Sequence, residues 1–370
     1  MISNIKTRVL IMAGGTGGHI FPGLAVAKHM KSKEISVFWL GSREGYEVEF
    51  LKGKEIKTRF IDISGLRGKG YLQILKAPFL LTRAVYQALK IIREFKPNVV
   101  LGMGGYVSGP GAVAAFLSRV PVVIHEQNAV MGTTNKIISK FAKKILVAFS
   151  TTHPDEIICG NPVNEKIITL DKKLERNEGK KYKSKLLILG GSRGALSINR
   201  NIPKALAIMT DDIELEVIHQ TGFSHLESTL NVYKSELTTN AFSSIKVVPF
   251  IDDISEAYKW ADFVVCRSGA LTISELAHVG ICSILVPFPH ATDDHQFENA
   301  KILERIGAAE IVLHHQFTPE FMAEKISFYA SNIEARNSMS VKGKLIAEIN
   351  STERVSDECL GVAHGKECKS

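Results

Sequence analysis

Glycine-rich loops that carry hydroxyl or imidazole side chains follow several apolar runs of this chain. The first, GGTGGH at residues 14–19, contains Thr16, Gly17, Gly18 and His19. Glycine lets the backbone turn tightly and approach a phosphate, and the N-terminus of the helix expected next presents free N–H groups to it. We expect His19, at the mouth of this loop, to meet substrate as a base or as a phosphate donor; a local cap or packing contact is the alternative.

Two more polar motifs follow strands expected in the same half of the chain. GMGGYVSGPG (102–111) is dense in glycine, and Tyr106 and Ser108 bring hydroxyl groups to it; a tight strand-to-helix turn is its plainest interpretation. HEQN (125–128) follows the apolar run PVVI. Open α/β sheets bind ligands outside the carboxyl ends of their strands, so both motifs are candidate binding sites, with a surface loop as the alternative for HEQN.

The second half of the chain repeats the order of strand, glycine turn and helix. GGSRGA (190–195) is one such turn, and CRSGALTISE (266–275) turns from a strand into a helix that begins near Ala270. Backbone N–H groups at that helix start, together with Arg267, could hold a phosphate. Glu275 lies one to two turns into the helix, where a carboxylate can accept the two vicinal hydroxyls of a ribose; a surface glutamate is the alternative.

A last polar motif is PHATDDHQFENA (289–300). Asp293 or Asp294 can cap a helix there. Gln296 and Asn299 are three residues apart, so they share a helix face, and two amides on one face suit sugar hydroxyls; plain surface polarity is the alternative. The two aspartates hint at a metal, but no third ligand has suitable spacing, so we expect none.

The order of apolar runs predicts the elements that position these motifs. Expected strands are 8–13, 35–41, 98–103, 121–126 and 144–149, and then 185–190, 214–220, 244–250, 263–266 and 283–288. Segments with helical periodicity lie between most of them. Buried apolar strands that alternate with helices are typical of doubly wound parallel sheets in an α/β fold.

The chain also has a weak internal repeat. Residues 9–19 and 186–195 both read as a strand, a glycine cluster and a helix start, about half a chain apart. Any α/β protein can place glycine after a strand, but the repeat favours two similar Rossmann-like halves facing each other across a cleft. The segment 171–185 is too polar to pack, so we place the boundary between about 160 and 184.

Composition excludes several classes of protein. The chain has 370 residues, 45% hydrophobic and 23% charged, which is ordinary for two soluble domains and excludes a disordered or collagen-like chain. Its five cysteines are scattered without a C-x-x-C pair, as expected in a reducing compartment without a zinc or redox site. We see no signal peptide and no apolar run long enough to span a membrane. The net charge of +8 favours anionic partners.

One segment, 64–90, places basic residues every seven positions, at Lys69, Lys76, Arg83 and Lys90. A continuous helix would gather them into one stripe, but Pro78 is expected to break it into two patches. Apolar residues lie nearby in the sequence: Leu72, Leu75, Phe79 and Leu80. The segment is either a core helix with a solvated basic face or a surface that rests on anionic lipid headgroups.

Taken together, these blocks resemble one family closely. GGTGGHIFPGLAVA, SGLRGKG, VLGMGGYVSGP, IHEQN, GNPV, GGSRGA, FIDD and CRSGALTISE occur in this order. They look like glycosyltransferase family 28, in its members that add N-acetylglucosamine (GlcNAc) to lipid I during bacterial peptidoglycan synthesis. The resemblance runs from about residue 8 to residue 310 and more weakly to residue 356.

The resemblance implies the GT-B fold, with an acceptor domain at 1–163, a UDP-GlcNAc domain at 164–345, and a C-terminal helix at 346–370 that returns to the first domain. It implies inverting transfer of GlcNAc from UDP-GlcNAc to the 4-hydroxyl of MurNAc in undecaprenyl-diphosphoryl-MurNAc-pentapeptide, giving lipid II and UDP. No metal cofactor would be needed. The enzyme would sit peripherally on the cytoplasmic face of the inner membrane, with an anionic membrane surface and no nucleic acid among its partners.

Residue roles also follow from the resemblance, position by position. Donor contacts would come from Thr16, Gly17, Gly18, Asn128, Ser192 and Ile251, from the helix start at Ala270, Leu271, Thr272, Ile273 and Ser274, and from Arg267, Glu275, Gln296 and Asn299. The acceptor would meet Gly104, Gly105, Tyr106 and Ser108. For the base on the acceptor hydroxyl, we expect His19, with Glu126 in reserve.

Two positions depart from the family pattern. Asn164 follows GNPV where the family usually has an arginine that helps to hold the donor, so that contact loses its charge. Arg193 stands where glutamine is frequent and adds charge beside the phosphates.

Three rival functions remain. One is another GT-B enzyme with a different donor or lipid acceptor. The second is a nicotinamide oxidoreductase, which the lack of an acidic residue at Gly41-Ser42-Arg43 disfavours. The third is a basic binder of nucleic acid or membrane, which would not explain polar glycine loops in both halves.

Overall fold

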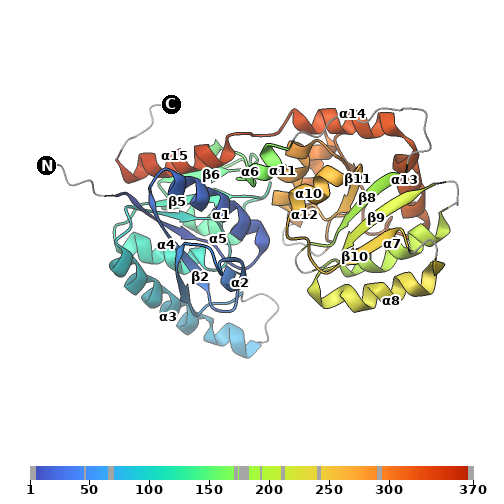
Figure 1. The fold of residues 1–370 in the computed structure, drawn as a ribbon. Helices are drawn as coiled ribbons and strands as arrows, with labels where there is room; N and C mark the ends of the chain where they lie inside the picture. Colours follow the sequence, from blue (N-terminus) through green and yellow to red (C-terminus); the bar gives the residue numbers. More distant parts are fainter. Residues whose placement is uncertain are drawn as a thin grey trace. The chain divides into compact units, whose positions relative to one another are not determined.

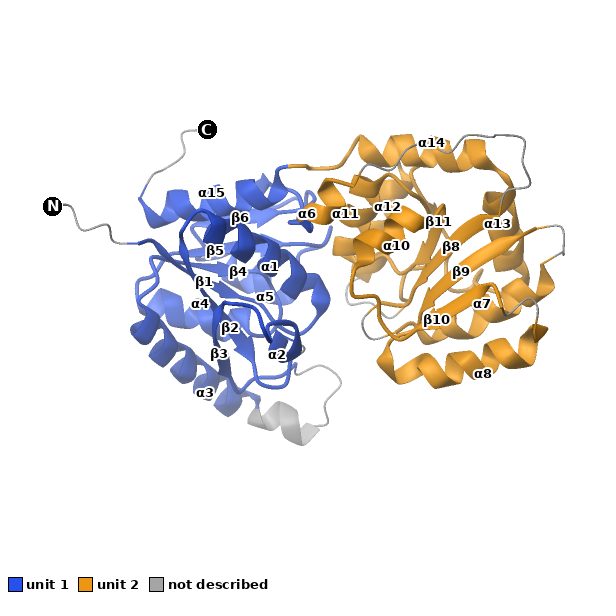
Figure 2. Ribbon diagram, in the orientation of Figure 1, with its two compact units in different colours: residues 1–164, 350–370 blue, residues 165–349 orange. Residues whose placement is uncertain are grey.

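The structure is a computed structural model that describes residues 6–45, 47–65, 71–170, 174, 183–191, 194–209, 213–239, 243–289 and 294–365, without the side chains of 71–76. The chain divides into two compact units (Figure 2). Unit 1 comprises residues 1–164 and 350–370, and unit 2 comprises residues 165–349. The chain therefore passes from one unit to the other twice, and unit 2 is a continuous insertion in unit 1.

Unit 1 contains a seven-stranded parallel sheet in the order β3-β2-β1-β4-β5-β6-β7 (Figure 1). Its strands are β1 (Arg8–Met12), β2 (Ser36–Ser42), β3 (Lys57–Ile61), β4 (Val99–Gly102), β5 (Val122–Glu126), β6 (Lys144–Val147) and β7 (Glu156–Ile158). The helices are α1 (Gly17–Ser32), α2 (Glu47–Phe50), α3 (Tyr71–Phe95), α4 (Ser108–Leu117), α5 (Thr133–Ile138) and α15 (Ser351–Ala363). The apolar runs do not predict β3 and β7, because both are edge strands without a buried run. β3 alternates exposed and partly covered residues, and β7 has only three residues, none of them buried.

Unit 2 contains a six-stranded parallel sheet in the order β10-β9-β8-β11-β12-β13. Its strands are β8 (Ser184–Leu189), β9 (Leu215–Gln220), β10 (Ile245–Val248), β11 (Phe263–Cys266), β12 (Cys282–Leu285) and β13 (Glu310–Ile311). The helices are α6 (Glu165–Ile168), α7 (Leu196–Ile208), η1 (Phe223–His225), α8 (Leu226–Glu236), α10 (Ile254–Trp260), α11 (Ala270–Val279), α12 (His295–Glu304), α13 (Pro319–Ser331) and α14 (Ile333–Lys344).

Both sheets follow the same winding rule. The first strand of each unit, β1 or β8, pairs with the second strand on one side and with the fourth on the other. Ligands bind at such switch points in doubly wound folds, outside the carboxyl ends of the strands. The expectation of two Rossmann-like α/β domains with parallel sheets is confirmed.

Helix α3 is continuous through Pro78, so the expected break at this residue is wrong. Proline removes one backbone hydrogen bond, but the helix continues because its later turns bury Ala84, Ala88 and Ile92 in the core. The basic residues expected along this helix are described only in part. Arg83 donates to the Asp62 carboxylate at 2.8 Å, Lys69 lies outside the described residues, and the side chain of Lys76 is not described.

The last helix, α15, completes the core of unit 1. Val355 and Cys359 are fully buried in the same cluster as Val9 and Leu101 of the central strands. The Ser351 hydroxyl donates to the Asn161 carbonyl at 2.6 Å, which joins the start of α15 to the loop after β7. The segment after unit 2 is thus an integral part of the first sheet's packing.

Candidate functional site

Two glycine loops of unit 1 interlock at the switch point between β1 and β4. Gly105 has a φ of +77°, and a Cβ atom there would lie 2.2 Å from the Gly14 carbonyl oxygen. Gly104 has a φ of +92°, and its Cβ would lie 2.8 Å from Nδ1 of His19. Only glycine combines this backbone with so close an approach. The loops after β1 and β4 therefore form one surface around the His19 imidazole.

The first glycine loop is held by a carboxylate from its own unit. Buried Glu47 accepts hydrogen bonds from the Gly15 amide at 3.2 Å and from the Ser42 amide at 2.6 Å. A phosphate would have to displace this carboxylate, so the geometry opposes a phosphate contact at the Gly15 amide. The sequence analysis missed Glu47, although it lies only five residues after the strand end where an acidic residue is lacking.

The other members of this loop lie around the start of α1. Thr16 is the exposed N-cap residue, and its side chain makes no capping hydrogen bond. Gly17 is buried against the Phe21 ring. A Cβ on Gly18 would meet only the Thr16 hydroxyl within 4 Å, at 3.7 Å, so this position is open to a ligand.

His19 is half-buried and belongs to a line of hydrogen bonds. Its Nδ1 lies 2.9 Å from Oε1 of Gln127. The Gln127 Nε2 lies 3.0 Å from Nδ1 of His125, whose Nε2 lies 2.9 Å from the Gly160 carbonyl oxygen. Burial lowers the pKa of His125 to about 4, so its ring is neutral at pH 7. No described residue hydrogen-bonds Nε2 of His19. The line thus runs from the buried core to one accessible imidazole.

Glu126, the reserve candidate for the base, is buried and fully engaged. Its carboxylate accepts hydrogen bonds from the backbone and the side-chain amide of Asn128, both at 3.0 Å. It also accepts from the Gly132 amide at 3.0 Å and from Asn135 Nδ2 at 2.8 Å. Four donors occupy the lone pairs that a base would need. Glu126 therefore orders the loop from 126 to 135, including Asn128.

Ser108 is also enclosed rather than presented to a ligand. Its buried hydroxyl lies 3.0 Å from the Met12 carbonyl oxygen and 2.8 Å from that of Gly104, and it donates toward both. The geometry thus opposes the expectation that Ser108 contacts the acceptor directly, because this hydroxyl joins β1 to the loop after β4. Tyr106 lies on the surface of the same loop, with its ring 3.0 Å from the Cβ position of Gly15.

In unit 2, the turn after β11 leads into α11 at Gly269. This N-cap residue has no side chain to cap the helix, and Ala270, Leu271 and Thr272 form the first turn. Amides at such a helix start attract anions. Ile273 and Ser274 are buried on the core side of the helix. The Ser274 hydroxyl donates to the Ala270 carbonyl at 3.2 Å, so it serves the helix itself.

Helix α12 is hydrogen-bonded to Ser268 in this turn. The Ser268 hydroxyl donates to the Gln296 carbonyl at 2.7 Å, and Asn299 Nδ2 donates to the Ser268 carbonyl at 3.2 Å. Asn299 is fully buried, which opposes the direct sugar contact expected for it. Gln296 accepts from the Phe288 amide through Oε1, which leaves its Nε2 pointing away from that amide. Asp293 lies outside the described residues, and Asp294 precedes α12 without a side-chain capping bond.

Glu275 accepts a hydrogen bond from the buried Tyr258 hydroxyl at 3.0 Å. Burial raises the pKa of Glu275 to about 7, and the bond from Tyr258 opposes this shift. The carboxylate is therefore about half protonated at neutral pH. Tyr258 was missed by the sequence analysis, because nothing in its own segment indicates a partner on α11.

Arg267 is held mainly by the protein itself. It donates to the Val286 and Pro287 carbonyl oxygens at 2.9 and 3.1 Å and to the Ser197 hydroxyl at 2.8 Å. Burial lowers its pKa to about 10, so the guanidinium stays charged at pH 7. Its charge thus lies one residue before the turn, and three of its five N–H donors are directed to internal acceptors.

The remaining expected site residues are scattered or undescribed. Ser192 and Arg193 lie outside the described residues. Ile251 follows β10, just before the N-cap Asp253 of α10. Asn164 is an exposed residue at the end of the first segment of unit 1.

A second buried histidine lies behind the glycine turn of unit 2. His219 Nδ1 lies 2.9 Å from the Tyr233 hydroxyl, and its Nε2 lies 3.0 Å from Oδ1 of Asn199. Asn199 Nδ2 donates to the Thr221 carbonyl at 2.9 Å. Burial lowers the pKa of His219 to about 3, so the ring is neutral. Thr221 in turn packs against Gly194: a Cβ atom on Gly194 would lie 2.3 Å from the carbonyl oxygen of Thr221.

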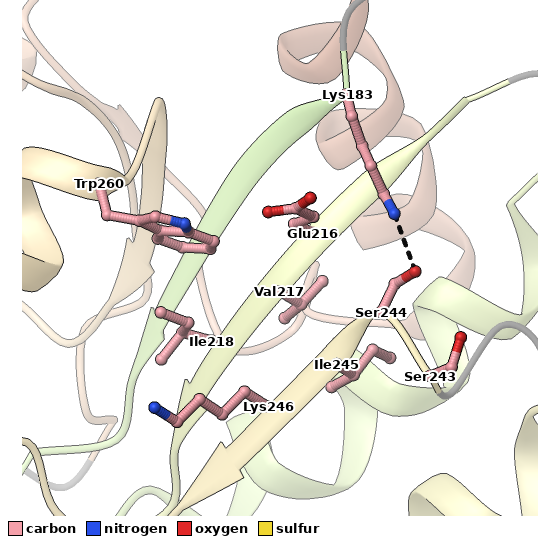
Figure 3. A pocket seen from close by; sticks show the side chains of 9 residues that line it. All are labelled: Lys183, Glu216, Val217, Ile218, Ser243, Ser244, Ile245, Lys246 and Trp260. Carbon is pink, nitrogen blue, oxygen red and sulfur yellow. Dashed lines mark hydrogen bonds between the residues drawn. The ribbon is translucent and has the colours of Figure 1, made fainter.

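A pocket of about 590 Å³ opens elsewhere on unit 2 (Figure 3). Trp260 and Ile218 form part of its wall, and Lys183 donates to the Ser244 hydroxyl at 3.0 Å on the opposite side. Lys183 and Ser244 directly precede β8 and β10, so the pocket includes the amino ends of these strands. Parallel sheets bind ligands at the other end, and we do not assign the donor to this pocket.

Among the described residues, no three acidic, histidine or cysteine side chains are grouped so that they could hold a metal ion. None of the described helices is both long and apolar enough to cross a bilayer.

Comparisons with known proteins agree over nearly the whole chain. The glycosyltransferase family 28 N-terminal domain matches residues 9–147, and the family 28 C-terminal domain matches residues 185–353. The UDP-N-acetylglucosamine--N-acetylmuramyl-(pentapeptide) pyrophosphoryl-undecaprenol N-acetylglucosamine transferase of Histophilus somni is 45% identical, covering 95% of this chain and 97% of its own. The protein of the same name from Haemophilus influenzae is 44% identical over 95% of this chain and 97% of its own.

A solved structure is similar at the level of the whole fold. The crystal structure of Acinetobacter baumannii MurG superposes with a TM-score of 0.79 at 38% identity, covering 96% of this chain and 99% of that one.

Proposed function

This chain belongs to glycosyltransferase family 28, and from that premise we propose how its residues divide the work of sugar transfer. The enzyme is a UDP-GlcNAc-dependent N-acetylglucosaminyltransferase of peptidoglycan synthesis. It transfers GlcNAc from UDP-GlcNAc to the 4-hydroxyl of MurNAc in undecaprenyl-diphosphoryl-MurNAc-pentapeptide, with inversion, and releases lipid II and UDP.

His19 is the base in this proposal, because its Nε2 is the accessible end of the hydrogen-bond line in unit 1. The acceptor O4 attacks the anomeric carbon of GlcNAc and forms the new C–O bond. The bond from that carbon to the diphosphate oxygen breaks, and its electron pair leaves with UDP. The O4 proton moves to His19 Nε2. Glu126 is less suited to this role, because four donors already occupy its carboxylate.

The donor is proposed to bind at the carboxyl edge of the sheet in unit 2. Amides at the start of α11 would stabilise the diphosphate as negative charge develops on UDP. Glu275 would accept the ribose hydroxyls, and the free Nε2 end of Gln296 would donate to GlcNAc. Arg267 adds positive charge next to the turn, while three of its five donors hold the guanidinium in place. We propose that amides and this charge do the work that a metal does in other transferases.

The membrane surface is proposed to lie on α3, α4 and α5, which pack in sequence against one another. Large apolar side chains are exposed there: Phe79, Leu80, Phe116, Leu117 and Ile137. Exposed cations border them at Lys136, Lys140 and Arg119. An apolar surface with a basic border binds anionic lipid headgroups. We propose that this surface holds the enzyme on the cytoplasmic face of the inner membrane, next to its lipid acceptor.

Labelled UDP-GlcNAc and a lipid I analogue test these assignments together. The wild-type protein should form the disaccharide lipid without added metal and in the presence of a chelator. His19→Ala should abolish most turnover while UDP still binds. A large rise in acceptor KM with near-normal kcat would instead assign His19 to the acceptor diphosphate, and dependence on a divalent cation would contradict the metal-free donor site.

A further inference from the structure

The polarity of the hydrogen bonds around His125 follows from one carbonyl. The Gly160 oxygen can only accept, so His125 Nε2 at 2.9 Å must carry a proton and donate. The ring is fully buried and neutral, so Nδ1 of His125 has no proton. Nδ1 must therefore accept a hydrogen bond, and the group next to it is the side-chain amide of Gln127 at 3.0 Å.

This acceptor determines which way the Gln127 amide faces. Its NH₂ group lies within hydrogen-bond distance of two acceptors, His125 Nδ1 at 3.0 Å and the His125 carbonyl oxygen at 3.1 Å. The reversed amide would place its oxygen against both of them. The buried His125 Nδ1 would then have no donor, and the carbonyl oxygen would keep only the longer bond from Asn135 Nδ2 at 3.3 Å. The Gln127 Oε1 atom is thus the one that faces His19 Nδ1 at 2.9 Å.

From this line of hydrogen bonds we propose that Gln127 is a positioning residue that holds His19 in the tautomer with the proton on Nδ1. An amide oxygen can only accept, so His19 Nδ1 must donate to it. The unprotonated Nε2 is then the nitrogen left to take a proton. This inference rests on the proposed role of His19 as the base, and it assigns to Gln127 the orientation and protonation state of that base.

The packing around Gln127 leaves it little freedom. The side chain is only 1% exposed. Its backbone carbonyl accepts from Asn161 Nδ2 at 3.1 Å. On the other side, a Cβ on Gly104 would lie 2.9 Å from His19 Cε1 and 3.4 Å from Gln127 Oε1, so the loop after β4 borders the same contact. The amide and the imidazole are therefore confined as a pair.

The arrangement also serves the proton transfer itself. When the acceptor O4–H proton moves to Nε2, the imidazole becomes a cation that keeps its proton on Nδ1. The Gln127 oxygen then accepts a charge-assisted hydrogen bond, which is stronger than the neutral one. The neutral Gln127 amide supplies this hydrogen bond, so no carboxylate is needed next to His19.

The tautomer can be measured without turnover. Protein labelled with ¹⁵N-histidine contains 12 histidines, and the His19→Gln spectrum identifies the pair of ring nitrogens that belongs to His19. Above the pH at which His19 takes up a proton, the wild-type spectrum should show a protonated Nδ1 and an unprotonated Nε2. The opposite pattern in the wild type overturns the proposal before any further variant is made.

Two variants then test Gln127 directly. Gln127→Leu removes the acceptor, so the His19 signals should move toward the Nε2–H tautomer and kcat should fall about tenfold or more, with donor KM nearly unchanged. Gln127→Glu keeps an oxygen opposite Nδ1 and should retain the Nδ1–H pattern. Its second oxygen replaces the NH₂ group that faces His125, so this variant should be less stable than the wild type while it keeps the tautomer. Gln87→Leu is the matched control, because Gln87 is a half-buried amide of unit 1 that bonds Asp62 and not His19; it should change neither readout.

The outcomes separate this inference from the function on which it rests. An unchanged Nδ1–H pattern in folded Gln127→Leu protein overturns the positioning role, whatever the activity. Loss of the pattern in Gln127→Leu with its retention in Gln127→Glu supports it. If His19→Gln turns over normally, the proposed base is wrong, and the spectra still decide whether Gln127 sets the tautomer.

Discussion

Each unit places a buried neutral histidine at the carboxyl edge of its parallel sheet, and the two are connected differently. His125 in unit 1 bonds through Gln127 to His19, a half-buried ring at a ligand-binding edge. His219 in unit 2 bonds to the buried Tyr233 and Asn199, and Asn199 bonds in turn to the Thr221 carbonyl next to the glycine turn. The same residue type in the same topological place thus has two uses: one network ends on a group that can exchange protons, and the other only supports a turn.

The difference indicates how the transfer is divided. Unit 1 keeps its first glycine loop occupied by the Glu47 carboxylate and presents an imidazole. Unit 2 presents a helix start without a side-chain cap, with Glu275 further along the same helix. Proton chemistry is therefore expected to depend on unit 1, and nucleotide affinity on unit 2.

The largest expected effect comes from removing the exposed end of the first network. His19→Ala should lower kcat by roughly 10²–10⁴-fold, because general-base catalysis contributes about that much. UDP affinity, measured by calorimetry, should change only slightly. His315→Ala, at an exposed histidine of unit 2, is the control. Near-normal turnover of His19→Ala would show that the network of unit 1 has no catalytic role and so does not differ in use from that of unit 2.

Breaking the second network should cost stability instead of rate. His219→Leu removes one hydrogen bond from the Tyr233 hydroxyl and one from the Asn199 oxygen, at about 1–3 kcal/mol each, so we expect a loss of roughly 2–6 kcal/mol. Denaturant unfolding measures this loss, and kcat of the folded protein should stay within a few-fold. A variant of normal stability with strongly reduced kcat would show that His219 has a direct catalytic connection.

Donor affinity should depend on pH through Glu275. The carboxylate must be ionised to accept two hydroxyls, and burial raises its pKa to about 7, so binding should strengthen as pH rises. If only the ionised form binds, UDP-GlcNAc affinity rises roughly tenfold from pH 6 to pH 8. Isothermal calorimetry at both pH values measures this change. Glu275→Gln should bind weakly and without this dependence, and the ribose assignment fails if the variant keeps normal donor affinity.

The smallest effect is expected from Tyr258→Phe. The Tyr258 hydroxyl donates to Glu275 and lowers the pKa of its carboxyl against the effect of burial. Without this bond the pKa rises further, so the midpoint of donor binding should move to higher pH and affinity at pH 7 should fall a few-fold. A midpoint that stays in place would show that the hydroxyl only fills space next to Glu275.

Sequence patterns predicted the strands and turns of the fold better than they predicted which side chains contact one another in the candidate site. The central strands, such as β1, β4, β8 and β11, are short fully buried runs, which periodicity identifies directly. The glycine turns were also correctly placed after these strands. Pro78 was misjudged because periodicity cannot weigh one lost hydrogen bond against the packing of a whole helix.

The site was predicted by residue type, and the residues whose geometry opposes direct ligand contact have one feature in common. Ser108 and Asn299 look like ligand contacts in the sequence, but their partners are backbone carbonyls brought close by the fold. Glu47 was overlooked, and Gln127 was noted only as one residue of HEQN, because their importance depends on groups 32 and 108 residues away along the chain. Spacing along a strand or helix predicts which residues share a face, and not which distant loop will meet them.

The placement of α15 has a consequence for biosynthesis. Val355 and Cys359 complete a core whose other members, such as Val9 and Leu101, emerge from the ribosome far earlier. Unit 2 is contiguous and can fold as soon as it is synthesised. Unit 1 must wait for its last helix, which at about 5–20 residues per second is synthesised roughly 10–40 s after the first segment of unit 1. During that delay its unfinished apolar face is available to chaperones, so the half made first is the half that matures last.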